Sequence, residues 1–248
     1  MKHSPLPARP IVITIDGPAG TGKSSVAAEL AARLGLEFLD TGAMYRAAAL
    51  LSIEREISPH DGSALAGAVR SAGLRFLWGS ARPRLMLDGR DVSERIRDMD
   101  VSRVVSIVAG CPTLRQLMVE EQRRIAREHP RLVTEGRDQG SIVFPDAIVR
   151  FYLDARPEVR AARRQAQLEA LGSAVDEQLV KADISRRDQL DSTRSEGPLR
   201  RPEGALLLDT TDLTLADVVD RLEALVREHV GESDPLPVGA GSGERSAR

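Results

Sequence analysis

Cysteine is nearly absent from this 248-residue chain, which contains only Cys111. One cysteine excludes an intramolecular disulfide and a cysteine-cluster metal site, so the sequence agrees with a reducing compartment and we expect a cytoplasmic protein. The residues around Cys111, VAGCP, indicate a helix break and include no histidine. We therefore interpret Cys111 as a packing residue rather than a nucleophile.

Long apolar runs are also lacking. No run approaches the roughly 18 residues that cross a bilayer, and the first one, IVITI at 11–15, is too short for the apolar core of an export signal. We expect a soluble protein with no membrane partner. The net charge of only −2 leaves no basic excess, so we expect no nucleic-acid partner either.

Two further residue types are scarce. Lysine occurs only at positions 2, 23 and 181, so nearly all of the 35 basic residues are arginine, although an arginine-rich genome would produce the same bias. Asparagine is absent, and without it the chain cannot contain the NKxD element by which guanine-binding GTPases read their base. Of the common nucleotides, ATP is therefore the better expectation.

The pattern of apolar residues predicts one α/β domain. Short apolar runs predict strands at 11–15, around 38–39, and at 131–134, 148–153 and 205–208. Periodic segments predict helices at 23–34 and at about 43–54, 113–128, 157–171, 176–194 and 214–229. Strands that alternate with helices and are apolar on both faces indicate a parallel sheet covered on both sides.

Three regions stand outside this alternation. Between about 60 and 100, GLRFLW and RLMLDG predict the strands of a small antiparallel insert, closed by DVSERIR. The ends of the chain, 1–10 and 231–248, are expected to be flexible, and the second of these is rich in Gly, Pro and Ser.

A phosphate-binding loop follows the first predicted strand and opens the first predicted helix. The stretch GPAGTGKSS at 17–25 satisfies GxxxxGK[ST], in which backbone N–H groups surround a phosphate, the lysine reaches the β and γ oxygens and the serine hydroxyl ligates Mg²⁺. A chance glycine turn is the alternative, but both flanks are of the required kind. The residues expected to bind ATP here are Gly17, Pro18, Ala19, Gly20, Thr21, Gly22, Lys23, Ser24 and Ser25.

Arginines in three other segments suggest a second anion site. Thr41 and Arg46 follow one strand, and Arg137 and Asp138 follow another, at the sheet edge where ligands of open α/β sheets bind. In a predicted helix, 187, 191 and 194 (Arg, Asp, Arg) share a face, and the preceding helix carries arginines at 160, 163 and 164. Surface charge and a solvated ion-pair stripe are the plainer interpretations of each segment. Together, joined around Gly172, the two helices would form a lid over transferring phosphates.

Such a lid suits phosphoryl transfer, which depends on positioning and charge neutralisation rather than covalent catalysis. The histidines at 3, 60, 129 and 229 show no ligand spacing, and we interpret them as surface residues.

The motifs together resemble the bacterial cytidylate kinase family. ITIDGPAGTGKSSVA, LDTGAMYRAAAL, DVSERIR, TEGRDQGSIVFPDA, FYLDARPEVRAARR and RRDQLDSTRSEGPL followed by LLLDTT occur in that family's order, over about 11–228. The resemblance implies a P-loop NTPase three-layer sandwich with a five-stranded parallel sheet. It also implies a small insert at about 60–100 that binds a nucleoside monophosphate, a helical lid at about 157–194, and ATP-dependent phosphorylation of CMP and dCMP.

The resemblance also implies roles for individual residues. Arg160 and Arg164 would join the loop in binding ATP, and Lys23, Arg137, Arg187 and Arg194 would be catalytic. Ser106, Arg115 and Asp138 would read cytosine, since a carboxylate accepts from the N4 amine of cytosine and repels the O4 of uracil. Mg²⁺ would accompany ATP on Ser24, with Asp16 as a further ligand by position. The residues implied for CMP are Thr41, Tyr45, Arg46, Ser106, Arg115, Arg137, Asp138, Arg187, Asp191 and Arg194.

Two alternatives stay open at this point. The chain could be a P-loop kinase for UMP or for a non-nucleotide metabolite, although Asp138 with Arg115 favours cytosine. It could also be a regulatory module that uses the loop as a nucleotide switch, which would not need acceptor arginines in three segments. We expect a monomer.

Overall fold

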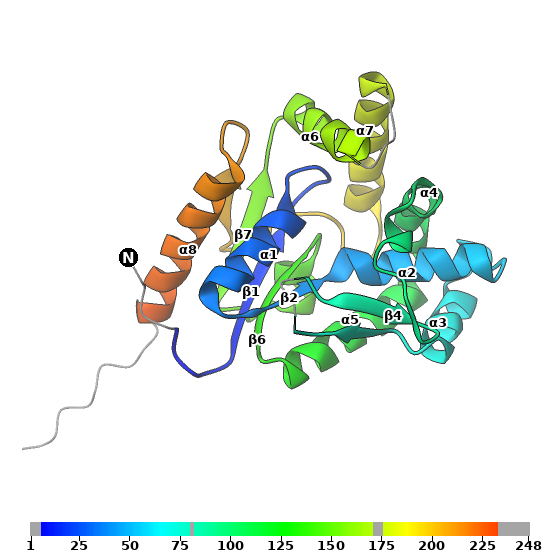
Figure 1. Cartoon of the computed structure of the whole chain (residues 1–248), viewed down its shortest axis with the longest axis horizontal. Helices are drawn as coiled ribbons and strands as arrows, with labels where there is room; N and C mark the ends of the chain where they lie inside the picture. The colour runs from blue at the N-terminus through cyan, green and yellow to red at the C-terminus, as the bar shows by residue number, and fades with distance from the viewer. Residues whose placement is uncertain (1–5, 80–81, 171–175, 233–248) are drawn as a thin grey trace, which may run out of the picture.

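A five-stranded parallel sheet runs through the computed structural model, which describes residues 6–79, 82–170 and 176–232 (Figure 1). Its strand order is β2-β6-β1-β7-β8, and all four neighbouring pairs are parallel. The strands are β1 (Ile11–Asp16), β2 (Glu37–Asp40), β6 (Arg131–Gly136), β7 (Val149–Asp154) and β8 (Leu206–Asp209). The five predicted strands are therefore confirmed, with shifts of one or two residues at their ends.

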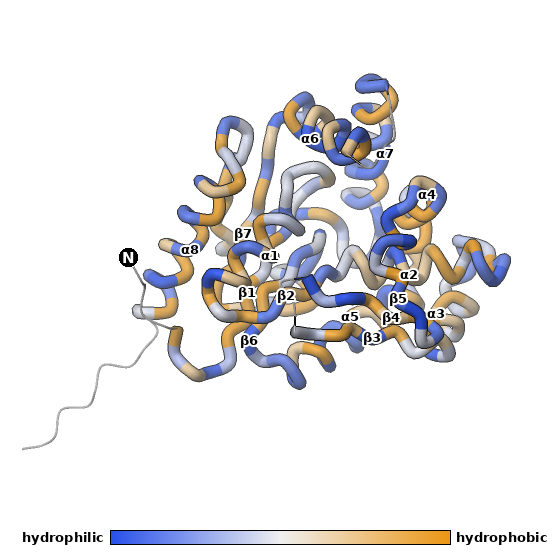
Figure 2. The backbone as a smooth tube through the Cα atoms, in the orientation of Figure 1, coloured by the Kyte–Doolittle hydropathy of each residue, from blue (hydrophilic) through white to orange (hydrophobic). Residues whose placement is uncertain are grey.

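Helices cover both faces of the sheet, which makes the fold a three-layer α/β sandwich as predicted. On one face, α1 (Lys23–Leu34) and α8 (Leu215–Glu232) share a core with apolar residues of β1, β6 and β7. On the other, α2 (Thr41–Glu54) and α5 (Pro112–Glu128) share a core with Leu39 and Leu132. Figure 2 shows hydrophobic and hydrophilic residues alternating along α8, as expected for a helix with one buried face.

The predicted insert contains an antiparallel sheet of β3 (Arg75–Leu77), β4 (Arg84–Leu87) and β5 (Arg90–Asp91). Two helices at the borders of the insert were not predicted, α3 (Gly62–Ser71) and α4 (Met99–Val108). The 3-10 turn η1 (Arg95–Arg97) directly precedes α4. A start signal for α3 was present, since the Asp61 side chain accepts from the backbone N–H of Ala64 at 2.9 Å. Cys111 lies buried between α4 and α5, which confirms the packing interpretation.

The two helices predicted to form a lid are α6 (Pro157–Ala170) and α7 (Glu177–Thr193). They share a small apolar cluster of Ala161, Leu168, Val180 and Ile184, into which Ala19 of the phosphate loop also packs. Because α7 ends at Thr193, Arg194 follows the helix instead of lying on its face as predicted. The predicted joint around Gly172 lies outside the described residues.

The expected flexible N-terminus is wrong for residues 6–10. Leu6 packs against the α1–α8 core, and the Arg131 guanidinium donates to the carbonyls of Pro7 and Arg9. Arg9 in turn donates to the carbonyl of Val230 at 3.2 Å. These contacts attach the segment to β6 and α8. The predicted flexible tail, 231–248, is wrong for 231 and 232, because α8 runs through both. The predictions for 1–5 and 233–248 fall outside the described residues.

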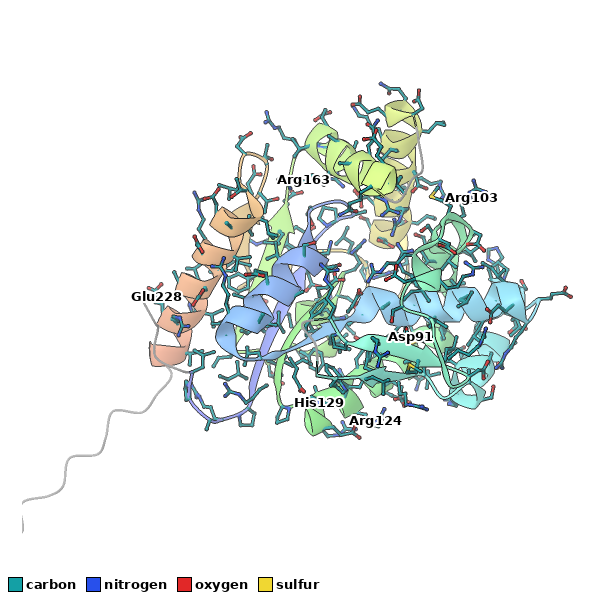
Figure 3. The ribbon with its side chains drawn as sticks, viewed as in Figure 1. Asp91, Arg103, Arg124, His129, Arg163 and Glu228 are labelled. Carbon is teal, nitrogen blue, oxygen red and sulfur yellow. The ribbon has the colours of Figure 1, made fainter. Side chains whose placement is uncertain are left out.

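His129 is not a plain surface residue. Its ring lies 4.1 Å from the Trp78 ring, centroid to centroid, and its Nδ1 lies 2.6 Å from Glu37 Oε2. It follows the end of α5 (Figure 3) and thus joins that end to the insert and to β2. Tertiary contact with an aromatic ring overrides the expectation drawn from its position at a helix end. His60 is exposed, as predicted.

None of the helices formed by residues 6–79, 82–170 and 176–232 is both long enough and apolar enough to cross a membrane.

Candidate active site

The phosphate loop turns from the end of β1 into α1. Gly22 caps the helix with a φ of 87°, and a Cβ at Gly17 would stand 2.1 Å from the carbonyl oxygen of Leu153, so glycine is required at both positions. Lys23 is 5% exposed, and its Nζ donates to the carbonyl of Pro18 at 2.7 Å. Burial, together with the neighbouring Arg137, lowers the pKa of Lys23 to about 7. A bound polyphosphate would restore its charge.

Asp16 does not occupy the predicted position beside Ser24. Its two carboxylate oxygens accept from the backbone N–H groups of Gln139 and Gly140, at 2.8 and 2.7 Å. Those two residues open η2 (Gln139–Val143), a short π-helix after β6. The Asp16 side chain is fully buried, and burial raises its pKa to about 6. Both Asp16 oxygens are therefore engaged by backbone N–H groups, which makes Asp16 a poor candidate for a magnesium ligand.

The acidic group beside Ser24 is Glu135, which sequence analysis missed. The Ser24 hydroxyl donates to Glu135 Oε1 at 2.8 Å, and burial and Asp40 raise the pKa of the Glu135 carboxyl. A signal was available, because β6 pairs with β1 and Glu135 stands opposite Ile15, at the same edge as the loop.

These two oxygen donors fit a magnesium ion. Mg²⁺ prefers oxygen ligands and commonly takes only one or two protein groups, with substrate phosphates and water completing its shell. Among the described residues no group of three or more His, Cys, Asp or Glu gathers as a metal site. Ser24 and Glu135 are the pair that would hold the ion.

A cavity of about 470 Å³ lies beside the loop and brings the predicted segments together. Its wall comes from the loop, from α2, α4 and α5, from the segment after β6, and from α6 and α7. These helices are labelled in Figure 1. Asp16, Gly17, Pro18, Thr21 and Arg160 do not belong to the wall. The predicted residues that line it are Ala19, Gly20, Gly22, Lys23, Ser24, Ser25, Thr41, Tyr45, Arg46, Ser106, Arg115, Arg137, Asp138, Arg164, Arg187, Asp191 and Arg194.

Partly buried arginines make part of the wall strongly cationic. Burial, Arg187 and Arg164 lower the pKa of Arg46 to about 9, and its Nη1 donates to the Ser102 hydroxyl at 2.9 Å. Burial and Arg137 likewise lower the pKa of Arg187, and its buried Nε has no hydrogen-bond partner in the structure. A bound anion would offset the repulsion between these guanidinium groups and would accept a hydrogen bond from Arg187 Nε. This wall is therefore suited to a phosphate.

A buried ion pair occupies another part of the wall. Arg115 Nη2 donates to Asp138 Oδ2, and the two side chains are only 4% and 5% exposed. Arg115 also donates to the carbonyl of Ala109 at 3.2 Å, and its guanidinium carbon lies 5.5 Å from the centre of the Tyr45 ring. A donor fork and a carboxylate beside an aromatic ring can read the hydrogen-bonding edge of a flat base.

Comparison with known proteins identifies the family. The family model described as "Cytidylate kinase" matches residues 13–228. The chain belongs to the cytidylate kinase family. It is 47% identical to the cytidylate kinase of Rhodococcus jostii (strain RHA1) over 223 residues, 89% of this chain and 96% of that one. It is 42% identical to that of Corynebacterium glutamicum over 229 residues, 92% of this chain and 100% of that one.

Solved structures are less similar. A gluconokinase from Sinorhizobium meliloti 1021 aligns with a TM-score of 0.48 at 14% identity, covering 90% of this chain and 95% of that one. The sequence relatives carry the assignment. As a cytidylate kinase family member, the protein is an enzyme, a phosphotransferase.

The three arginines of α6 have different surroundings in this kinase. Arg164 lines the cavity, whereas Arg163 (Figure 3) donates to the hydroxyl and carbonyl of Thr210. Arg160 is buried and donates to the carbonyls of Ala155 and Ala19. The expectation that these three arginines together line a lid over the phosphates therefore fails for Arg163, because Arg163 and Arg164 are adjacent and point to different sides of the helix.

Two arginines of the insert also reach the kinase cavity and were missed. Arg97 Nη2 lies 3.3 Å from Asp40 Oδ2, and Arg82 donates to the Ser25 hydroxyl at 3.3 Å. Arg97 ends the motif DVSERIR, so a signal for it was available. Nothing in the sequence separates Arg82 from the many other arginines, since only the fold of the insert brings it to the cavity.

Proposed function

We propose that this cytidylate kinase family member transfers the γ-phosphoryl group of ATP to CMP and dCMP. A phosphate oxygen of the acceptor attacks the γ phosphorus, the bond to the β–γ bridging oxygen breaks, and ADP leaves with CDP or dCDP. The observation that carries the proposal is one cavity that joins a phosphate loop, a wall of partly buried arginines and the buried Arg115–Asp138 pair.

The donor side consists of the loop. Its backbone N–H groups and the N-terminus of α1 would hold the β-phosphate, and Lys23 would follow the γ-phosphoryl group as negative charge shifts to the leaving oxygen. Bound Mg²⁺ neutralises charge on the donor phosphates. Ser24 and Glu135 are the residues we assign to it, in place of Asp16.

The acceptor side consists of side chains. Arg46, Arg137 and Arg187 would grip the CMP phosphate, and neighbouring Asp191 accepts from Arg137 Nε at 2.8 Å, which fixes the direction of that guanidinium. The sugar and base of CMP would contact Ser106, Asp191 and Arg194. In-line transfer needs the phosphates of donor and acceptor to be held opposite each other by cations in fixed positions.

Asp138 and Arg115 would select the base. Asp138 accepts from the N4 amine of cytosine but repels the O4 of uracil, and Arg115 donates to O2 and N3. The pair is already formed and buried, so cytosine must compete with or extend its hydrogen bond. A base that offers the wrong edge leaves a buried charge uncompensated, which favours discrimination.

Two parts of the chain would move around this site. We assign the insert at about 60–100 to monophosphate binding and α6 with α7 to a lid that excludes water. A monomeric, cytoplasmic enzyme stays a prediction, which sedimentation and cell fractionation would test.

The deciding experiment is ADP release by the purified protein with ATP and Mg²⁺, across CMP, dCMP, UMP, AMP, GMP and no acceptor. We expect turnover with CMP and dCMP, little with UMP and almost none without acceptor. Preference for UMP would overturn the base assignment. ADP release that no monophosphate alters would mean that the arginine wall does not bind an acceptor.

A further inference from the structure

Asp188 lies on α7 directly after Arg187, yet its side chain does not face the cavity. One carboxylate oxygen, Oδ1, accepts from the backbone N–H of Ala19 in the phosphate loop at 2.9 Å. The other, Oδ2, accepts from Arg160 Nη1 on α6. The carboxylate thus connects both lid helices to the loop.

Arg160 completes the connection from the other helix. Its Nη1 also donates to the carbonyl of Ala19 at 2.9 Å, so lid side chains hold both polar backbone groups of this residue. The backbones themselves are close, because a Cβ at Gly20 would stand 2.8 Å from the carbonyl oxygen of Arg160. We call Arg160, Asp188 and the Ala19 backbone the latch.

The latch is largely shielded from water. The Arg160 and Asp188 side chains are 10% and 17% exposed, and Ala19 packs into the apolar cluster of the lid. Charged hydrogen bonds in such surroundings are stronger than neutral ones, and removing one partner leaves the other charge uncompensated.

The latch lies one residue from the group that holds Lys23. The Lys23 ammonium donates to the carbonyl of Pro18, and Pro18 precedes Ala19. The positions of Arg187, Ala19 and Lys23 are therefore connected through consecutive contacts: Arg187 precedes Asp188 on α7, Asp188 holds Ala19, and the residue before Ala19 binds the lysine.

We propose that Arg160 and Asp188 are positioning residues for phosphoryl transfer. They hold the first half of the phosphate loop against the lid, so that Lys23 and Arg187 address the same phosphoryl group. The inference rests on the proposed function. It assigns Arg160 to the loop backbone rather than to ATP. It also gives a role to Asp188, which lies within the motif RRDQLDSTRSEGPL but received no role from it.

The test is Asp188→Asn, which keeps the size of the side chain and one acceptor for the Ala19 N–H but removes the charge that faces Arg160. We expect kcat to fall about 10- to 100-fold, the range for a charged hydrogen bond. KM for CMP should change less than about threefold, because Arg46, Arg137 and the Arg115–Asp138 pair keep their contacts. The urea midpoint, measured in parallel, gives the change in stability.

The matched control is Glu158→Gln. Glu158 and Lys181 also join α6 to α7, at 3.2 Å, but both are exposed, and neither side chain is hydrogen-bonded to the loop among the described residues. We expect its kcat to stay within about twofold of the wild type. In the double variant Arg160→Met with Asp188→Asn, kcat should fall little further than in the worse single variant, since both changes open one latch.

Wild-type kcat in folded Asp188→Asn would overturn the proposal, and so would equal losses in Glu158→Gln. If Asp188→Asn does not fold, Arg160→Lys decides, because an ammonium lacks the planar fork that serves both Ala19 and Asp188. Folded Arg160→Lys with unchanged kcat would reject the latch. A wild-type protein inactive with CMP would instead reject the proposed function, which separates the two failures.

Discussion

The donor and acceptor sides of the cavity are built in opposite ways. The proposed donor side is a single stretch, 17–25, whose backbone N–H groups and one lysine would bind the phosphates of ATP. The acceptor side takes side chains from α2, α4, α5, α7 and the segment after β6. A site made by the backbone depends on local turns, whereas a site made by side chains depends on packing between distant segments. The two sides should therefore respond differently to mutation.

The largest effect is expected for the donor side. Lys23→Met should lower kcat by about 100- to 1,000-fold or more, because it removes charge stabilisation of the transferring phosphoryl group. Stability should hold, since burial already disfavours the charged lysine. ADP release at saturating CMP and a urea midpoint measure the two effects. Normal turnover by this variant would remove the loop from the mechanism.

A smaller effect, confined to specificity, is expected on the acceptor side. Asp138→Asn should lower the preference for CMP over UMP, as a ratio of kcat/KM, by about 10- to 100-fold, because the amide can donate to the O4 of uracil. KM for ATP should stay unchanged. Competition between the two monophosphates in one assay measures the ratio, and an unaltered ratio would exclude Asp138 as the reader of the base.

A substitution of Asp16 tests the junction between the two sides of the cavity, where the end of β1 contacts η2. Asp16→Asn should destabilise the fold by about 1–3 kcal/mol at pH 4, because its amide nitrogen cannot accept from Gln139 or Gly140. The pKa of Asp16 in the folded protein, about 6, exceeds the ordinary value of 3.8. The advantage of the wild type over Asp16→Asn in free energy of unfolding is therefore full below pH 3.8 and shrinks as pH rises through 6. Urea titrations at pH 4, 5, 6 and 7 measure it. An advantage that grows with pH would contradict the raised pKa.

The smallest effect is expected for Arg82→Ala. Arg82 is an exposed arginine of the insert with a 3.3 Å contact to Ser25, so KM for CMP or ATP should rise no more than about fivefold and kcat should hold. Steady-state kinetics with each substrate varied checks this. A large loss of kcat would mean that the insert takes part in catalysis and that the acceptor side extends to the loop.

Much of the fold was predictable because its signals are local. Each of the five strands is a short apolar run, and six helices follow from periodic apolar residues or caps, as with Gly35, which ends α1 at a φ of 64°. Helices α3 and α4 were missed although each has one buried apolar face, because about 60–100 was interpreted as an antiparallel insert and 101–112 was assigned no element. The attachment of residues 6–10 also escaped notice, since it depends on Arg131, far along the chain.

The candidate site divides in the same manner. Sequence alone determined the phosphate loop, because glycines that allow a tight turn and a lysine at fixed spacing act within nine residues. It also determined, through whole motifs, which arginines to expect near the acceptor. Only the tertiary structure decided between Asp16 and Glu135 beside Ser24, and placed Arg160 and Asp188 on the backbone of Ala19. The reason is physical: a carboxylate one residue from a site faces it or turns away according to the hydrogen bonds that distant segments offer.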